Sequence, residues 1–157
     1  MGDGEVRIMD ADEIGAIVVE AIEQLYAEEG KIISFDIGER TISSSLAWLL
    51  VPHFPKHKVH VEYNRHDIYP KEIELPDAEG ELTESKVFPD IIVHVPGSDH
   101  DNLLVIEIKK STSNRSNERD LMKLQQIKQS FRYRHALFVR LSMGEEASIE
   151  DCALQWV

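Results

Sequence analysis

Two acidic residues and a lysine are spaced so that a β-hairpin would bring them together. Asp90 precedes the apolar run 91–93, and Glu107 and Lys109 lie at the end of the next apolar run. Between the two runs, residues 96–102 are a cluster of turn-forming types. Antiparallel pairing places the start of one strand opposite the end of the next, and side chains two apart in a strand share a face. We therefore expect Asp90, Glu107 and Lys109 to meet at one end of the hairpin.

Two carboxylates beside an ammonium group indicate a particular chemistry. Carboxylate oxygens are hard ligands that suit Mg²⁺, which keeps several waters and accepts phosphate oxygens into its shell. Such an ion polarises a phosphate and lowers the pKa of a bound water, while a lysine alongside orients that water or stabilises developing charge. The pattern predicts hydrolysis of a phosphodiester with Mg²⁺, for which Mn²⁺ can substitute. The alternative is an exposed strand end whose charges form a surface ion pair of little energetic value.

The arrangement Pro89-Asp90, sixteen residues, then Glu107-Ile108-Lys109 resembles the signature of the PD-(D/E)XK nuclease superfamily, which has a restriction endonuclease-like fold. The resemblance implies that Asp90 and Glu107 bind the metal, that the Ile108 carbonyl completes the shell, and that Lys109 positions the attacking water. It further implies an endo- or exodeoxyribonuclease of a restriction, repair or defence system. RNA as the substrate stays open.

The same resemblance gives Glu39 a role. Many members of the superfamily carry an extra acidic residue on a helix before the core strands, and Glu39 stands at the matching position as an accessory catalytic ligand. The spacing Asp36-x-x-Glu39 is also that of a capping box, which would explain Glu39 by helix initiation alone. Both interpretations stay open at this point.

Charge is distributed unevenly along the chain. The formal net charge is −12, yet residues 109–140 contain nine basic and two acidic residues. Phosphate binding normally leaves such a basic footprint. The expected helix after the hairpin presents donors at helical spacing, which either contact phosphate or form a solvated face. The residues predicted to bind nucleic acid are Lys110, Arg115, Arg119, Lys123 and Gln126.

The apolar periodicity predicts an α/β fold. A first helix is expected to be capped by Asp10 and to end near Gly30. The later expected elements are a helix from 36 to about 51, a strand at 58–64, the hairpin within 87–110, a helix at about 117–132, a strand at 135–141, and a short helix or edge strand at 149–157. The acidic segment 65–86 is expected to be a loop or two short edge strands.

This order matches the αβββαβ core of the restriction endonuclease-like fold, with a mixed central sheet flanked by helices and an extra N-terminal helix. We expect one domain over residues 1–157, with its core at about 36–141.

Composition limits the setting in which the protein acts. No apolar run reaches membrane-spanning length and the N-terminus lacks a signal-peptide pattern, so we expect a cytoplasmic protein without a membrane partner. The single cysteine excludes an internal disulfide. A homodimer or a subunit of a larger complex is expected. A protein that keeps the nuclease fold but binds nucleic acid or protein without cleaving is the alternative function.

Overall fold

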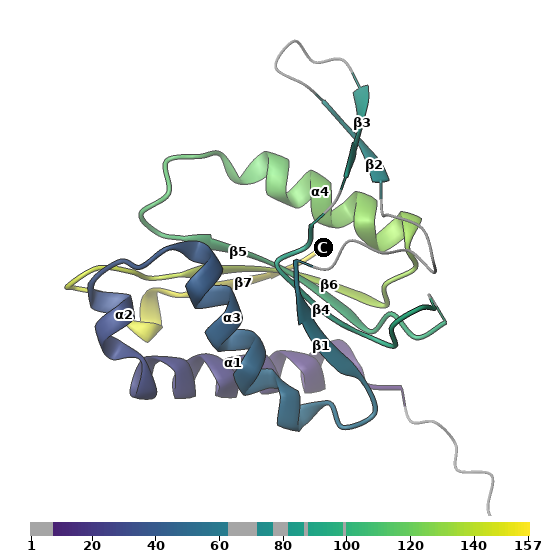
Figure 1. Ribbon diagram of the computed structural model, residues 1–157. Coiled ribbons are helices and arrows are strands. Elements are labelled where there is room, and N and C mark those ends of the chain that lie inside the picture. The colour runs from purple at the N-terminus through teal and green to yellow at the C-terminus, as the bar shows by residue number, and fades with distance from the viewer. Residues whose placement is uncertain (1–7, 63–71, 77–81, 87, 99) are drawn as a thin grey trace, which may run out of the picture.

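The computed structural model describes residues 8–62, 72–76, 82–86, 88–98 and 100–157. Its centre is a five-stranded mixed sheet covered by helices on both faces (Figure 1). The strands in spatial order are β1 (Lys58–Val61), β4 (Ile91–His94), β5 (Leu104–Lys110), β6 (His135–Leu141) and β7 (Ala153–Trp156). Strands β5 and β6 are parallel, and the other neighbouring pairs are antiparallel. The chain therefore has the predicted α/β architecture with a mixed sheet.

Helices form a layer on each side of this sheet. One side carries α1 (Ala11–Glu28), α2 (Gly30–Ser34) and α3 (Glu39–Leu50), and the other carries α4 (Asn117–Ser130) (Figure 1). Two 3₁₀ turns, η1 (Val51–His53) and η2 (Ile149–Asp151), follow α3 and precede β7. Within the described ranges, no helix combines the length and the apolar character that crossing a membrane requires.

Helix α1 forms as its sequence pattern predicts. The Asp10 carboxylate accepts a hydrogen bond from the Glu13 N–H at 2.9 Å and so caps the helix. The apolar stripe faces the sheet, where its members are fully or almost fully buried: Ile14, Val18, Ala21, Ile22 and Leu25. The helix ends at Glu28, and the short α2 begins at Gly30.

Helix α3 starts three residues later than expected. Its N-cap is Gly38, and Glu39 is the first helical residue, so the predicted start at Asp36 was wrong. Asp36 has a φ of 53°, and its carboxylate accepts hydrogen bonds from Lys110 Nζ at 3.1 Å and from the Thr112 hydroxyl at 3.0 Å. The Asp36 side chain thus bonds to residues at and just after the end of β5 and does not form a capping box.

The segment after β1 also differs from the simplest prediction. Strand β1 ends at Val61, and Glu62 follows with a φ of 49°. The last two residues of the predicted strand 58–64 lie outside the described residues. Strands β2 (Glu72–Pro76) and β3 (Leu82–Lys86) pair antiparallel as a separate two-stranded sheet. Of the two alternatives for 65–86, two short strands are therefore present, and residues 65–71 and 77–81 lie outside the described residues.

The second half of the chain follows the prediction closely. Strand β6 spans the predicted 135–141 and runs parallel to β5, because α4 connects them. The C-terminal segment contains both predicted alternatives, since η2 precedes the edge strand β7.

Successive side chains of β5 point into two different layers, one on each side of the sheet. Leu104, Ile106 and Ile108 pack in the core beneath α1 and α3, whereas Val105 packs in the core beneath α4. Glu107 and Lys109 continue the Val105 face, as the period of two in a strand requires. The end of β5 therefore turns two charged side chains toward the α4 layer.

Replacement of Ile106 by alanine tests this packing. Ile106 is fully buried in the central strand, so Ile106→Ala should lower the free energy of unfolding by about 2–5 kcal/mol through lost burial and a residual cavity. Urea unfolding measures the change. Val19→Ala on the exposed side of α1 is the control and should change stability by less than about 0.5 kcal/mol. Equal effects of the two substitutions would contradict this assignment of the core.

Candidate active site

Asp90 and Glu107 lie next to each other where β4 begins and β5 nears its end. The Ile108 N–H donates to Asp90 Oδ2 at 2.7 Å, and the Asp90 N–H donates to Glu107 Oε1 at 3.3 Å. The register that pairs Ile91 with Ile106 produces this contact, because it places residue 90 opposite 107. Each carboxylate is thus held by the main chain of the other strand.

Lys109 lies on the same face of β5 as Glu107 and is 4% exposed. Its Nζ is 3.5 Å from Asp120 Oδ2, which comes from the first turn of α4. Sequence reasoning did not single out Asp120. The available signal was its position three residues before Lys123, which places both residues on one face of the helix.

Lys123 contacts the acidic pair directly. Its Nζ lies 2.9 Å from Glu107 Oε1 and donates to the main-chain oxygen of Phe88 at 3.3 Å. The sequence predicted a phosphate contact for Lys123, whereas its side chain in this structure forms an ion pair with Glu107.

Glu39 lies within electrostatic reach of the site from the first turn of α3. Burial raises the pKa of its carboxyl, and the Asp90 carboxylate raises it further, while Arg115 and Lys110 lower it. The structure thus brings Glu39 near Asp90 from the opposite helical layer. Because Asp36 makes no capping box, helix initiation does not account for Glu39.

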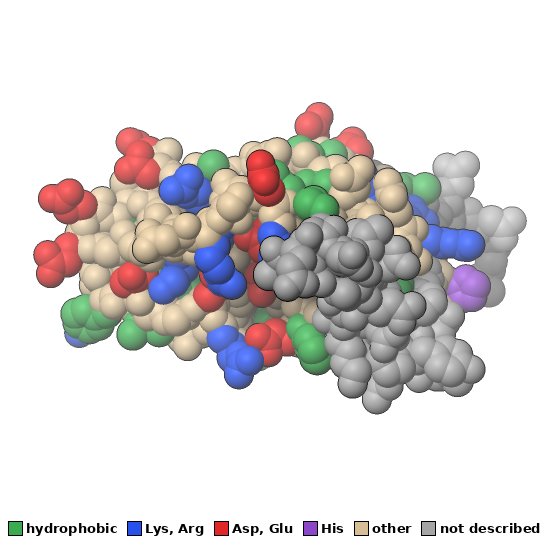
Figure 2. Space-filling view, turned by 90° about the horizontal axis from the view of Figure 1, so that it is seen from above, with side chains coloured by type: hydrophobic (Ala, Val, Ile, Leu, Met, Phe, Trp, Pro, Cys, Tyr) green, Lys and Arg blue, Asp and Glu red, His purple; other side chains and the backbone are tan. Residues whose placement is uncertain are grey.

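The other predicted nucleic-acid-binding residues differ in how exposed they are. Lys110 pairs with Asp36, whereas Arg115, Arg119 and Gln126 are exposed. Arg119, Lys123 and Gln126 share one side of α4, since they are four and seven residues apart. Figure 2 shows the α4 side of the molecule, where Lys and Arg side chains lie among acidic ones. The predicted basic stripe is therefore interrupted by ion pairs.

Burial disfavours the charged form of both carboxyl groups. Glu107 is 4% exposed, and desolvation, followed by repulsion from Asp90, raises its pKa from the ordinary value near 4.5 to about 8. Desolvation also raises the pKa of Asp90, against the stabilising N–H of Ile108 and the charge of Lys123. Both shifts mean that two adjacent carboxylate charges are disfavoured here, and a bound divalent cation would stabilise the charged forms.

The donor set fits Mg²⁺. Among the described residues, no three His, Cys, Asp or Glu side chains are arranged to hold a metal ion by themselves. Mg²⁺ requires fewer protein ligands, because it is usually bound by one or two carboxylates and takes water and phosphate oxygens for the rest. Asp90 and Glu107 supply the carboxylates. The Ile108 N–H faces Asp90, and in a strand the carbonyl of the same residue faces the same neighbour.

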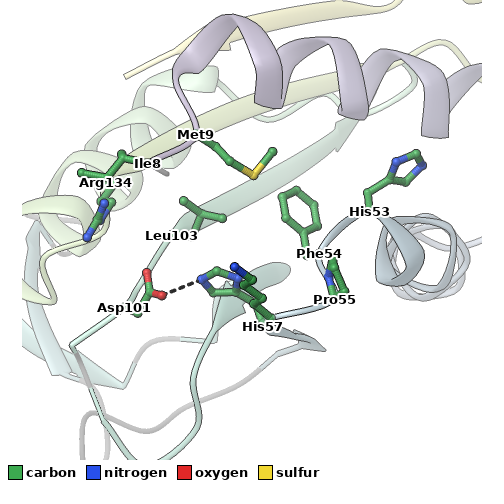
Figure 3. A pocket seen from close by; sticks show the side chains of 10 residues that line it. Ile8, Met9, His53, Phe54, Pro55, His57, Asp101, Leu103 and Arg134 are labelled. Carbon is green, nitrogen blue, oxygen red and sulfur yellow. Dashed lines mark hydrogen bonds and ion pairs between the residues drawn. The ribbon is translucent and has the colours of Figure 1, made fainter. Parts of the chain in front are cut away.

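A separate cavity of about 210 Å³ lies at the other end of the sheet, before the first residues of β5 and β6 (Figure 3). Its wall is mainly apolar, with Met9, Phe54 and Leu103, and His57 pairs with Asp101 there at 2.9 Å. None of the predicted site residues lines this cavity. It lacks the paired carboxylates that metal chemistry needs.

Comparisons with known proteins give little support for any assignment. No protein-family model matches the chain, and no curated protein matches it. A solved structure described as the crystal structure of SSO0001 is similar over 89% of this chain, with 17% sequence identity and a TM-score of 0.44. This chain covers 62% of that structure. Similarity at this level carries no argument about function, so any functional assignment depends on the site itself.

The pKa of Glu107 predicts how stability depends on pH in the absence of metal. Between pH 4.5 and 8 the folded protein binds more protons than the unfolded chain, so the free energy of unfolding falls as pH rises. Glu107→Gln should remove this loss, which we expect to be on the order of 2 kcal/mol between pH 5 and pH 8. Urea unfolding in EDTA at both pH values measures it.

The control is Glu20→Gln, because Glu20 is exposed in the middle of α1. It should keep the wild-type dependence on pH. If Glu107→Gln loses as much stability between pH 5 and pH 8 as the wild type does, burial of the Glu107 charge is not the cause.

Proposed function

We propose that this chain is a Mg²⁺-dependent PD-(D/E)XK nuclease that hydrolyses DNA phosphodiester bonds with Asp90, Glu107 and Lys109. The observation that carries the proposal is the convergence of the two carboxylates, which are 17 residues apart in sequence and joined by hydrogen bonds to each other's strands. Hard oxygen donors in a buried position favour a hard divalent cation over other ligands. Phosphate oxygens are the natural partners of such an ion.

The order of elements is consistent with this family. Helix α3 is followed by β1, β4 and β5, then by α4 and β6, and β5 runs parallel to β6. This sequence supports an αβββαβ core of the restriction endonuclease-like type, with α1 as an addition and the β2–β3 hairpin as an insertion. Fold alone does not determine activity, so the proposal depends on the site residues.

Each residue has a defined task in the proposed reaction. Asp90 and Glu107, with the Ile108 carbonyl, hold the ion, which when bound polarises the phosphate and lowers the pKa of a water. Lys109 orients that water and is itself kept in place by Asp120. Glu39 assists from α3 as an accessory acidic group. Arg115, Arg119 and Gln126 contact the phosphates on either side, where Lys110 adds positive charge.

One observation favours the alternative of a non-cleaving binding module. The ammonium of Lys123 lies 2.9 Å from Glu107 Oε1, so a protein cation already neutralises part of the acidic pair. In the nuclease, Lys123 has to release Glu107 and turn to a phosphate. In a binding module, the ion pair remains in place.

The setting of the enzyme is proposed by analogy with the resembled superfamily. We place the enzyme in the cytoplasm, as a homodimer that cuts two strands with two sites, or as a subunit of a restriction, repair or defence complex in which another chain supplies target recognition.

Activity assays test the proposal directly. The wild type should cleave at least one member of a mixed set of single-stranded DNA, duplex DNA and RNA with Mg²⁺ or Mn²⁺, and not in EDTA. Asp90→Asn and Lys109→Ala should each lower the rate by about 10²-fold or more, because each removes a group that acts on the transition state. Matched controls are Asp12→Asn on α1 and Lys58→Ala on β1, both exposed. Tight binding without cleavage would favour the binding module.

Metal binding can be measured independently of cleavage. Mn²⁺ or Mg²⁺ alone should stabilise the wild type by about 2.7 kcal/mol at 100 times its dissociation constant, because a ligand selective for the folded state raises stability. Thermal unfolding with and without the ion measures the gain. Asp90→Asn should abolish most of it, and Asp12→Asn should keep it. Equal stabilisation of both variants would place the ion elsewhere.

A further inference from the structure

An exposed aromatic residue lies close in the chain to the proposed metal site. Phe88 is 51% exposed, although it precedes buried Pro89 and the start of β4. It lies two residues before Asp90, and Cα atoms two apart in a chain are at most about 7 Å apart. An exposed aromatic ring offers an apolar face on which a ligand with a flat ring could stack.

The main chain of Phe88 belongs to the hydrogen-bonded network of the site. Its oxygen accepts from Lys123 Nζ, and the same ammonium contacts Glu107. Met122, the residue before Lys123, is also 42% exposed on α4. The main chain of an exposed aromatic residue is therefore in direct contact with the cation that we expect to hold a phosphate.

The electrostatic attraction of this site for a polyanion is reduced. Lys109, Lys110 and Lys123 are each engaged by an acidic side chain of the chain itself. The chain also carries a net charge of −12, which opposes a polyanion. Part of the binding energy then has to come from contacts that do not depend on charge, and stacking of a base on an aromatic ring is such a contact.

We propose that Phe88 stacks on a nucleobase next to the cleaved phosphate, and that the substrate is DNA with unpaired nucleotides at that position. This inference rests on the proposed function and specifies its substrate class. Inside a duplex both faces of each base are covered by neighbouring bases, so a ring can stack only where the strand is unpaired or a base has left the stack. A single-stranded tail, flap or end offers that face without the cost of opening a duplex.

Binding measured without metal tests this inference separately from cleavage. The probe is a fluorescent single-stranded DNA oligonucleotide, compared by anisotropy in EDTA with a blunt hairpin duplex of the same sequence. The wild type should bind the single strand at least tenfold more tightly. Phe88→Ala should weaken single-strand binding by about tenfold or more, Phe88→Trp should retain it, and duplex binding should not change.

Trp48→Ala is the matched control, because Trp48 is 77% exposed on α3 beside Glu28 and Glu29 rather than beside the acidic pair. It should bind both DNA forms as the wild type does. An oligonucleotide containing 2-aminopurine should lose fluorescence on binding the wild type through stacking, and should lose less with Phe88→Ala. Because Phe88 is half exposed, unchanged thermal stability of the variant verifies that it folds.

The outcomes separate the two proposals. Metal-dependent cleavage with equal affinity for both DNA forms, or with no effect of Phe88→Ala, overturns the inference and leaves the nuclease assignment standing. Absence of binding to either form overturns the inference as well, and the cleavage assay then decides the nuclease assignment. If cleavage occurs, Phe88→Ala should raise KM for the single strand and leave kcat nearly unchanged, since stacking acts on binding.

Discussion

Two carboxyl groups lie side by side at the edge of the protein interior, and the positions of the surrounding residues follow from that constraint. Water stabilises a carboxylate strongly, so removing two of them from water at adjacent positions is unfavourable unless hydrogen bonds and cations compensate. Here the Ile108 N–H donates a hydrogen bond to Asp90 and the Asp90 N–H donates one to Glu107, while Lys123 adds a positive charge. The main-chain donors are fixed by strand pairing, which makes the compensation part of the fold. Of these three groups, the lysine side chain is the one that can rotate away.

The neighbouring lysines are also paired with acidic side chains. Lys109 lies against Asp120, and Lys110 lies against Asp36, so each lysine at the end of β5 is matched by an acidic residue from a different helix or loop. These pairs join β5 to α4 and to the segment before α3. They keep the site organised in a chain of net charge −12, but they reduce the positive potential available to a polyanion. For the proposed nuclease, we therefore expect DNA affinity to come from a few local contacts near the site rather than from a basic surface.

Local periodicity determined how much of this could be predicted. Strand β6 and the face shared by Glu107 and Lys109 followed from alternation, because a buried strand leaves a direct pattern in the sequence. The start of α3 could not be predicted from alternation or periodicity, because Asp36 is held by Lys110 and Thr112, which lie 74 and 76 residues away. The role of Asp120 and the pairing of Lys123 with Glu107 were missed for the same reason. A sequence pattern predicts which residues share a face, whereas the partner across a layer depends on how helix and sheet are packed.

Helix α4 contributes side chains both to the site and to the hydrophobic core. Leu124 and Ile127 pack into the core with Val105 and Phe138, whereas Asp120 and Lys123, one turn earlier and on the side of the site, reach Lys109 and Glu107. Any movement of α4 to admit a cation or a phosphate would open that core and lose apolar burial. Rotation of the flexible four-carbon chain of Lys123 changes the same contact without moving the helix. The proposed exchange of Lys123 for a metal ion at Glu107 would therefore require a side-chain rotation alone, and the strands and helix that position the carboxylates would remain as they are.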